Sequence, residues 1–112
     1  MQLSSKERAF LKKLAHNLDP IVRIGKDGID ENVLKSISDV INKRELIKVK
    51  ILQNSTVEVE RELGTEIANK TQSVFVDSIG KILILFKPSK AKDAKITPEF
   101  NEFKKKYESH GK

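Results

Sequence analysis

The sequence predicts an α/β protein of the α+β type, in which one mixed four-stranded sheet is packed with three helices. In three stretches of the chain, apolar residues recur at helical spacing. Between and after them lie short stretches with the alternation or the continuous hydrophobicity of strands. In chain order these elements read αβαβαββ, which favours a single sheet covered by helices.

The first helix is expected over residues 4–18. Ser4 and Glu7 have the spacing of a capping box, and Asp19-Pro20 ends the helix because proline disfavours a helical residue before it. The apolar face consists of Phe10, Leu11, Leu14, Ala15 and Leu18. The other side carries Lys6, Lys12, Lys13 and His16. These four form either an ordinary solvated face or a basic stripe for a polyanion such as RNA.

A strand is expected at Ile21–Ile24, and a G-x-x-G loop follows it, formed by Gly25, Lys26, Asp27 and Gly28. A loop of this kind before a helix holds the nucleic-acid backbone in one class of RNA-binding modules. Lys26 and the positive end of the next helix also attract phosphate. The alternative is a tight turn with glycines for local reasons. Asp27 counts against phosphate binding because it places a negative charge beside the loop.

The second helix is expected from Glu31 to Lys43, with Asp30 as its N-cap. Ile29 and Leu34 have the spacing of a hydrophobic staple. The buried face of this helix is expected to contain Val33, Leu34, Ile37, Val40 and Ile41.

The remaining strands differ in pattern. Leu46–Leu52 alternates, so Ile47, Val49 and Ile51 point one way while Lys48 and Lys50 point to a face that is solvated or meets an anion. A third strand is expected at Ser73–Ser78. The continuous run Ile82–Phe86 is typical of a strand covered on both faces.

A third helix between these strands is expected from a capping box at Ser55 and Glu58 to about Lys70. Four glutamates make it the acidic helix, so we expect it to face away from any nucleic acid. They are Glu58, Glu60, Glu62 and Glu66.

The composition changes after residue 88, which divides the chain into a domain of residues 1–88 and a tail of residues 89–112. The tail begins as a basic linker. Thr97 and Pro98 then read as the N-cap and first residue of a short amphipathic helix that presents Phe100, Phe103 and Tyr107. This helix could dock on the domain, bind a partner, or form only on contact with RNA.

The net charge of +6 is unevenly distributed. Residues 1–50 hold 11 basic and 7 acidic side chains and residues 88–112 hold 7 and 4, whereas residues 51–87 hold 4 and 5. Uneven positive charge points to a polyanionic partner.

The composition also argues against several other classes of function. The chain has no cysteine, which excludes disulfides, thiol catalysis and cysteine-rich zinc sites. Its two histidines, His16 and His110, read as solvent-facing, and no catalytic spacing or phosphate-binding P-loop occurs. We therefore expect no enzyme, no metal, no cofactor, no small-molecule substrate and no membrane association. A monomeric, cytoplasmic protein is the expectation.

Three blocks in this order resemble the signatures of the CRM domain of YhbY-like proteins, named for chloroplast RNA splicing and ribosome maturation. The blocks are residues 25–29, residues 44–50 and residues 80–87, and the similarity covers about residues 3–88. The resemblance implies an RNA-binding module with a G-x-x-G loop and a fold similar to the C-terminal domain of bacterial translation initiation factor three. Stand-alone bacterial members are associated with precursors of the large ribosomal subunit, and plant members act in group II intron splicing.

Carried onto this sequence, the resemblance makes Gly25, Lys26, Asp27 and Gly28 the expected RNA contact. Arg44, Lys48 and Lys50 match the basic block of the second strand. Lys12, Lys13 and Arg23, which are not carried over from the resemblance, complete the expected basic surface. The sequence departs from the family pattern in two places: Gln72 stands where glycine usually follows Thr71, and Phe86-Lys87 replaces Tyr-Arg.

The hypothesis from the sequence is therefore an RNA-binding protein, with ribosomal RNA of the large-subunit precursor as its target. The alternative is a protein-interaction module that docks on a ribosomal protein or an assembly factor through the aromatic residues of the tail.

Overall fold

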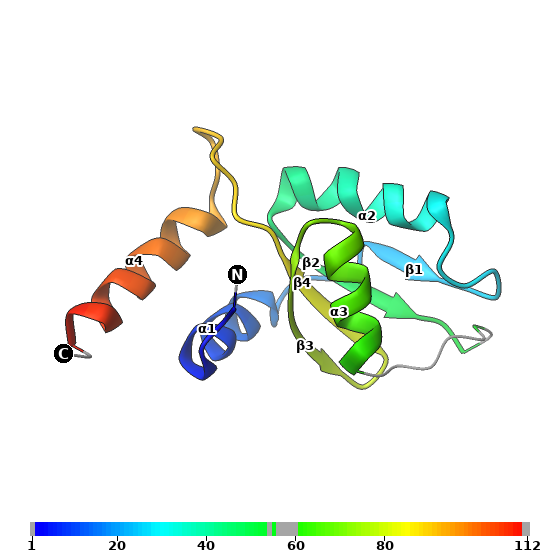
Figure 1. The fold of residues 1–112 in the computed structure, drawn as a ribbon, viewed down its shortest axis with the longest axis horizontal. Coiled ribbons are helices and arrows are strands. Elements are labelled where there is room, and N and C mark those ends of the chain that lie inside the picture. Colours follow the sequence, from blue (N-terminus) through cyan, green and yellow to red (C-terminus); the bar gives the residue numbers. More distant parts are fainter. Residues whose placement is uncertain (1, 54, 56–60, 111–112) are drawn as a thin grey trace.

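The structure, a computed structural model, describes residues 2–53, 55 and 61–110. Its elements are α1 (Ser5–Ala15), β1 (Val22–Ile24), α2 (Glu31–Arg44), β2 (Leu46–Ile51), α3 (Arg61–Lys70), β3 (Val74–Ile79), β4 (Ile82–Phe86) and α4 (Ile96–His110). The predicted order αβαβαββ is confirmed, and α4 follows it at the C-terminal end (Figure 1).

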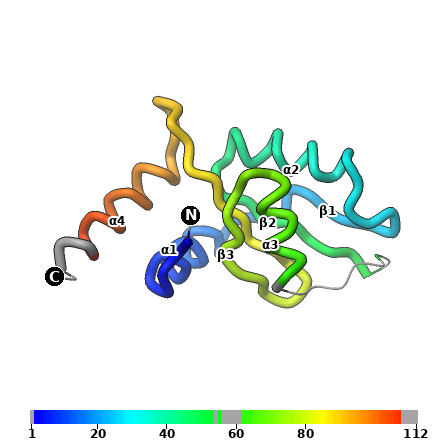
Figure 2. The backbone as a smooth tube through the Cα atoms, in the orientation of Figure 1, coloured from blue at the N-terminus to red at the C-terminus, as the bar shows by residue number. Residues whose placement is uncertain are grey.

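The strands form one mixed sheet in the order β1-β2-β4-β3. β1 runs parallel to β2, while β2 and β3 both run antiparallel to β4. β2 and β4 are therefore the central strands. The backbone trace shows the long axis of the molecule running from α4 at one end to the turn after β1 at the other (Figure 2).

One face of the sheet packs against α2 and α3. Its buried strand residues are Val22, Ile24, Ile47, Val49, Ile51, Leu83 and Leu85, and they meet Ile37, Ile41, Ile67 and Ala68 from the helices. The alternation predicted for β2 is confirmed, because its three β-branched residues, Ile47, Val49 and Ile51, all lie on this face. Gly64 of α3 lies against the ring of Phe75 in β3, and a Cβ at Gly64 would overlap that ring.

The other face packs against α1 and α4. Leu46, Val76, Ile84 and Phe86 of the strands form a second cluster here with Leu11, Ala15 and Phe100 of the helices. Leu83 and Leu85 lie on the first face and Ile84 and Phe86 on the second, and all four are fully buried. The prediction that β4 is covered on both faces is confirmed.

The predicted helix starts are largely confirmed. Glu7 donates its backbone N–H to the Ser4 hydroxyl while its carboxylate accepts the Ser4 N–H, which completes the capping box. Asp30 caps α2 as expected. The end of α1 was predicted wrongly: α1 ends at Ala15, and a turn from the Leu18 N–H to the Ala15 carbonyl follows. Leu18 is therefore exposed and lies outside the apolar face of α1.

The start of β3 also differs from expectation. β3 begins one residue later than predicted, and a register irregularity between Phe75 and Asp77 interrupts its pairing with β4. The predicted capping box of Ser55 and Glu58 lies outside the described residues at Glu58, so α3 is described only from Arg61 onward.

The backbone at Gln72 shows why the family pattern has a glycine at this position. It lies just beyond the end of α3 with φ at +56°, in the left-handed region. Helices commonly end with a glycine in this conformation because a Cβ there is unfavourable. The family glycine thus corresponds to a backbone requirement that this chain meets with a glutamine.

The C-terminal helix is longer than predicted and is capped differently. α4 has 15 residues and begins before Thr97, so Thr97 is not its N-cap. The carboxylate of Glu45, the residue that ends α2, instead accepts hydrogen bonds at the start of α4. The donors are the N–H groups of Lys95, Ile96 and Thr97 at 2.9, 3.3 and 2.7 Å and the Thr97 hydroxyl at 2.6 Å. Helix N-termini attract negative charge, so this carboxylate replaces a local cap.

Aromatic contacts fix α4 to the rest of the chain. The Phe100 ring lies 5.0 Å from that of Phe86, and the Phe103 ring stacks on Phe10 of α1 at 4.3 Å between centroids. Of the three arrangements considered for the tail, docking on the domain is the one the structure shows (Figure 1).

Replacing Gln72 with glycine should stabilise the fold. We expect Gln72→Gly to raise the free energy of unfolding by about 0.5–1 kcal/mol, because relief of the left-handed strain exceeds the extra entropy of the unfolded chain. Urea unfolding followed by circular dichroism measures this. The matched control is Asn69→Gly within α3, which should destabilise by about 0.3–0.5 kcal/mol, the difference in helix propensity between the two residues. A destabilised Gln72→Gly protein would contradict the strain argument.

The cap of α4 should make the free energy of unfolding depend on pH in the acidic range. Burial alone would raise the pKa of Glu45, but the Thr97 hydroxyl and three backbone N–H donors outweigh it and lower that pKa below the ordinary value. The stabilisation is therefore complete above about pH 4.5 and is lost as the pH falls through the lowered native pKa. Glu45→Gln should cost about 1–3 kcal/mol at pH 7, since the buried donors lose their charged acceptor.

The measurement is the urea midpoint between pH 3 and pH 7. The midpoint of Glu45→Gln should fall less steeply with acid than that of the wild type. A residual slope is expected from Asp77: burial would raise the pKa of Asp77, but its hydrogen bond from Lys12 lowers it. Glu102→Gln, an exposed change beyond the first turn of α4, is the control and should keep the wild-type slope. Equal slopes for Glu45→Gln and the wild type would show that the Glu45 cap does not contribute to the acid dependence of stability.

Candidate nucleic-acid interface

The G-x-x-G loop is a closed turn at one end of the sheet. The Gly28 N–H donates to the Gly25 carbonyl at 3.0 Å, and Lys26 and Asp27 are exposed at the tip. Gly28 is buried and has φ at +70°, whereas Gly25 has no positive φ. The local backbone therefore requires glycine at position 28 only.

The positive end of α2 does not serve as an open phosphate site. The carboxylate of Asp30 accepts the Val33 N–H at 2.9 Å, and Glu31 lies in the first turn of the same helix. With Asp27 in the loop, three carboxylates lie in this segment. Attraction for phosphate at this end of the molecule must therefore come from lysine and arginine side chains.

The strand register brings such side chains together. Arg23 of β1 is paired with Lys50 of β2, and both are exposed. Paired residues of neighbouring strands lie about 4.8 Å apart and point to the same face. Lys48 lies on that face too, two residues along β2. It is half-buried and donates from Nζ to the His16 carbonyl at 3.3 Å, beyond the end of α1. Arg23 and Lys50 thus form an exposed cationic pair beside the loop.

Lys81 is a further cation that the sequence analysis did not assign to the site. Its carbonyl accepts the Ile51 N–H at 2.8 Å, while the Leu52 N–H donates to the Ile24 carbonyl at 2.9 Å. The turn between β3 and β4 therefore lies at the same end of the sheet as the loop, and Lys81 is exposed there. The only sequence signal for it was its place in the third block of the family resemblance.

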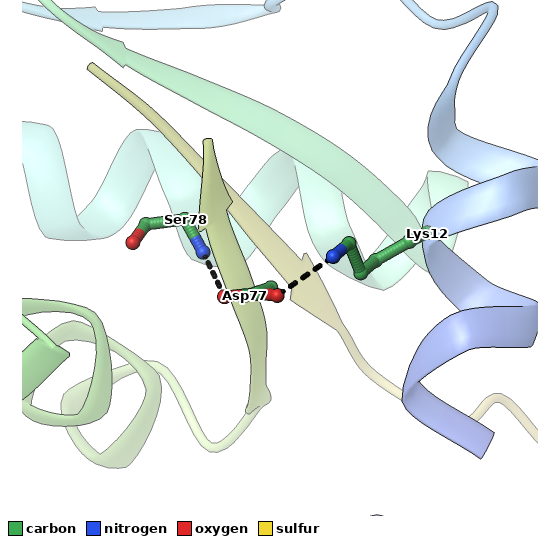
Figure 3. A network of polar contacts seen from close by, with 3 residues as sticks. All are labelled: Lys12, Asp77 and Ser78. Carbon is green, nitrogen blue, oxygen red and sulfur yellow. Dashed lines mark hydrogen bonds and ion pairs between the residues drawn. The ribbon is translucent and has the colours of Figure 1, made fainter. Parts of the chain in front are cut away.

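Lys12 is not part of a freely solvated face. Its Nζ lies 2.9 Å from the Asp77 carboxylate, which also accepts the Ser78 N–H at 2.8 Å (Figure 3). Lys12 is half-buried and joins α1 to β3. The expectation that it lies on the exposed side of α1 with its neighbours is wrong, because α1 turns this residue toward the sheet.

The remaining two predicted cations lie elsewhere. Lys13 is exposed on the last turn of α1. Arg44 is exposed at the end of α2, separated by one residue from the start of β2, whereas the loop lies beside the other end of β2. The six residues of β2 separate the two positions by about 20 Å. The structure therefore groups the loop with Arg23, Lys48 and Lys50 and leaves Arg44 at the opposite end of the sheet.

Within the described residues, no group of histidine, aspartate and glutamate side chains could hold a metal ion. His16 is exposed near the end of α1. None of the helices in the described ranges combines the length and hydropathy needed to cross a membrane.

Comparisons with known proteins agree with this architecture. The family model of the CRS1/YhbY (CRM) domain matches residues 3–87, which include α1 to β4 and exclude α4. Among solved structures, a hypothetical protein from Staphylococcus aureus matches with a TM-score of 0.69 and 41% sequence identity, over 82% of this chain and 95% of that one.

Several curated proteins are also similar. An RNA-binding protein of Haemophilus influenzae is 42% identical over 94 residues, which cover 84% of this chain and 92% of that protein. The probable RNA-binding protein YqeI of Bacillus subtilis is 38% identical over 88 residues, covering 79% and 91%. A probable RNA-binding protein of Methanocaldococcus jannaschii is 31% identical over 120 residues, covering 94% and 89%.

The two loop glycines should respond differently to substitution. Gly28→Ala should destabilise the protein by about 1–2 kcal/mol, because alanine is unfavourable at a positive φ. Gly25→Ala should change the free energy of unfolding by less than about 0.5 kcal/mol, since its φ needs no glycine. Urea unfolding of both variants distinguishes them. Equal costs would show that Gly25 also has a structural role in the turn.

Proposed function

Because the chain belongs to the CRS1/YhbY (CRM) family, we propose that it binds RNA through the loop of residues 25–28 and the adjacent cationic face. The proposed target is ribosomal RNA of the large-subunit precursor, to which stand-alone members of the family are associated. In this proposal the protein acts as a monomer in the cytoplasm.

The observation that carries the proposal is the pairing of Arg23 with Lys50 beside the loop. The two strands place two exposed cations next to each other on one sheet face, and Lys26 adds a third at the loop tip. Two like charges this close are unfavourable for the isolated protein and become favourable when an anion lies between them. A backbone phosphate is the anion that the family relationship favours.

The mechanism follows from the chemistry of these groups. Arg23 offers a planar fork of donors suited to phosphate, while Lys26 and Lys50 act as mobile point charges. The turn at Gly25 lacks a side chain, so an RNA backbone can approach it closely. The six aromatic residues of the chain all lie outside the loop and β1. Recognition at this end therefore depends on RNA shape and phosphate positions more than on base stacking.

The alternative, a protein-interaction module, rested on the aromatic residues of the tail. Phe100 is buried against Phe86, and Phe103 stacks on Phe10. Packing within the chain accounts for these two residues, so they no longer favour a protein partner.

Removing three cations at the loop end should weaken RNA binding. We expect the combination of Arg23→Gln, Lys26→Gln and Lys50→Gln to lower affinity for large-subunit ribosomal RNA by about 10-fold to 1,000-fold near physiological salt, because fewer counterions are released. The slope of log affinity against log salt should decrease by about 0.9 for each phosphate that the variant no longer neutralises. Filter binding across a salt series provides both quantities.

The matched control removes the same charge elsewhere, with Lys35→Gln, Lys90→Gln and Lys92→Gln, all exposed and outside this face. The control should retain affinity to within about threefold, since long-range charge is screened. If both variants lost the same affinity for RNA, binding would depend on net charge alone, and the proposed site would be refuted. A messenger RNA fragment of equal length, used as competitor, tests the ribosomal target: equal competition would refute that part.

A further inference from the structure

A second surface with the chemistry of a nucleic-acid contact lies between α1 and α4, and its α4 side is outside the region that the family model matches. It is a hollow of about 290 Å³ lined by Lys6 and Glu7 of α1 and by Phe103, Lys104 and Tyr107 of α4. The Lys6 Nζ lies 4.8 Å from the centre of the Tyr107 ring, and the Phe103 ring lies 4.4 Å from the same ring.

Tyr107 is not needed to hold α4 in place. The helix is anchored near its start, by the carboxylate of Glu45 and by Phe100, which is 1% exposed. Tyr107 lies almost two turns further along and is 42% exposed, the highest exposure of any aromatic side chain in the chain. Its ring contacts the Phe103 ring and the Lys6 ammonium.

The charge around the ring favours an anionic ligand. Lys6 and Lys104 line the hollow with one carboxylate, that of Glu7. This carboxylate accepts the Ser4 N–H in the capping box of α1, so its charge is partly neutralised by the end of a helix. Lys105 and Lys106 lie on the same turn of α4 as Lys104, while Glu102 lies two residues and Glu99 five residues before Lys104.

We propose that this surface, formed by Lys6, Phe103, Lys104 and Tyr107, is a second RNA contact that takes an unstacked nucleotide of a single strand. The base lies on the Tyr107 ring, and Lys6 and Lys104 neutralise its phosphates. A stacked base gains more than an exposed cation–π contact does, so the base displaces the Lys6 ammonium. The displaced ammonium is still within reach of the phosphate.

This inference rests on the proposed function, since both name RNA as the ligand, but it concerns a different part of the molecule. The loop of residues 25–28 lies at the opposite end of the long axis, whose extent is 47 Å (Figure 1). The loop end offers cations without aromatic rings, and the α1–α4 end offers both. We therefore assign structured RNA to the loop end and a flanking single strand to the α1–α4 end.

The test uses the fluorescence of Tyr107, which is the sole tyrosine of a chain without tryptophan. The full-length protein is titrated with single-stranded decaadenylate RNA, with a blunt RNA duplex of equal length, and with heparin. Stacking predicts saturable quenching by the single strand, little quenching by the duplex and none by heparin. Equal quenching by the duplex, or quenching by heparin, would overturn the proposal.

Substitutions provide the second arm, measured by the anisotropy of labelled decaadenylate. Tyr107→Leu should lower affinity about tenfold, whereas Tyr107→Phe, which keeps the ring, should bind as the wild type does. Lys6→Gln with Lys104→Gln should also weaken binding, and Lys90→Gln with Lys92→Gln should not. Circular dichroism confirms that α4 is intact in each variant. Unchanged affinity of a folded Tyr107→Leu protein would overturn the proposal.

The experiments can refute either of the two proposals without refuting the other. The protein carrying Arg23→Gln, Lys26→Gln and Lys50→Gln should still show tyrosine quenching by decaadenylate. If its quenching persists while neither it nor the wild type binds ribosomal RNA, the proposed function fails and the second contact stands. If ribosomal RNA binds without quenching by the single strand, the second contact fails and the proposed function stands.

Discussion

Strand β4 imposes the main constraint on this fold, because its side chains must be kept from water on both faces of the sheet. Leu83 to Phe86 are all fully buried. A sheet covered by helices on one side only would leave Ile84 and Phe86 exposed. The hydrophobic effect therefore requires two helical layers, α2 with α3 on one face and α1 with α4 on the other. The other elements of the chain are arranged around this requirement.

The second layer covers its face of the sheet only in part, and this separates a structural end from a charged end. Leu46 and Phe86, at one end, lie under the helices, and Glu45 beside them holds the start of α4. At the other end of the same face, Lys50 of β2 and Arg23 of β1 remain exposed. The alternation of β2 thus serves packing at its beginning and presents charge at its end.

Local patterns in the sequence were sufficient to predict much of the fold. The features predicted in this way are determined by residues that are neighbours in the chain. The caps at Ser4 and Asp30 and the two faces of β2 are of this kind. The cap of α4 could not be predicted, since Glu45 lies 50 to 52 residues from its donors. The candidate site was predictable only in part. Its residue types could be named, but strand register and helix rotation determine that Arg23 lies beside Lys50, that Lys12 turns to Asp77 and that Arg44 lies far from the loop.

The long separation between Glu45 and α4 has a consequence for folding of the chain. The ladder hydrogen bonds of the four strands do not involve α4, so the sheet can pair before α4 docks. Until α4 docks, Phe86 lacks its aromatic partner and the carboxylate of Glu45 lacks its donors. A chain at that stage exposes apolar surface at this end of the sheet, and intermediates of this kind are prone to association with other chains.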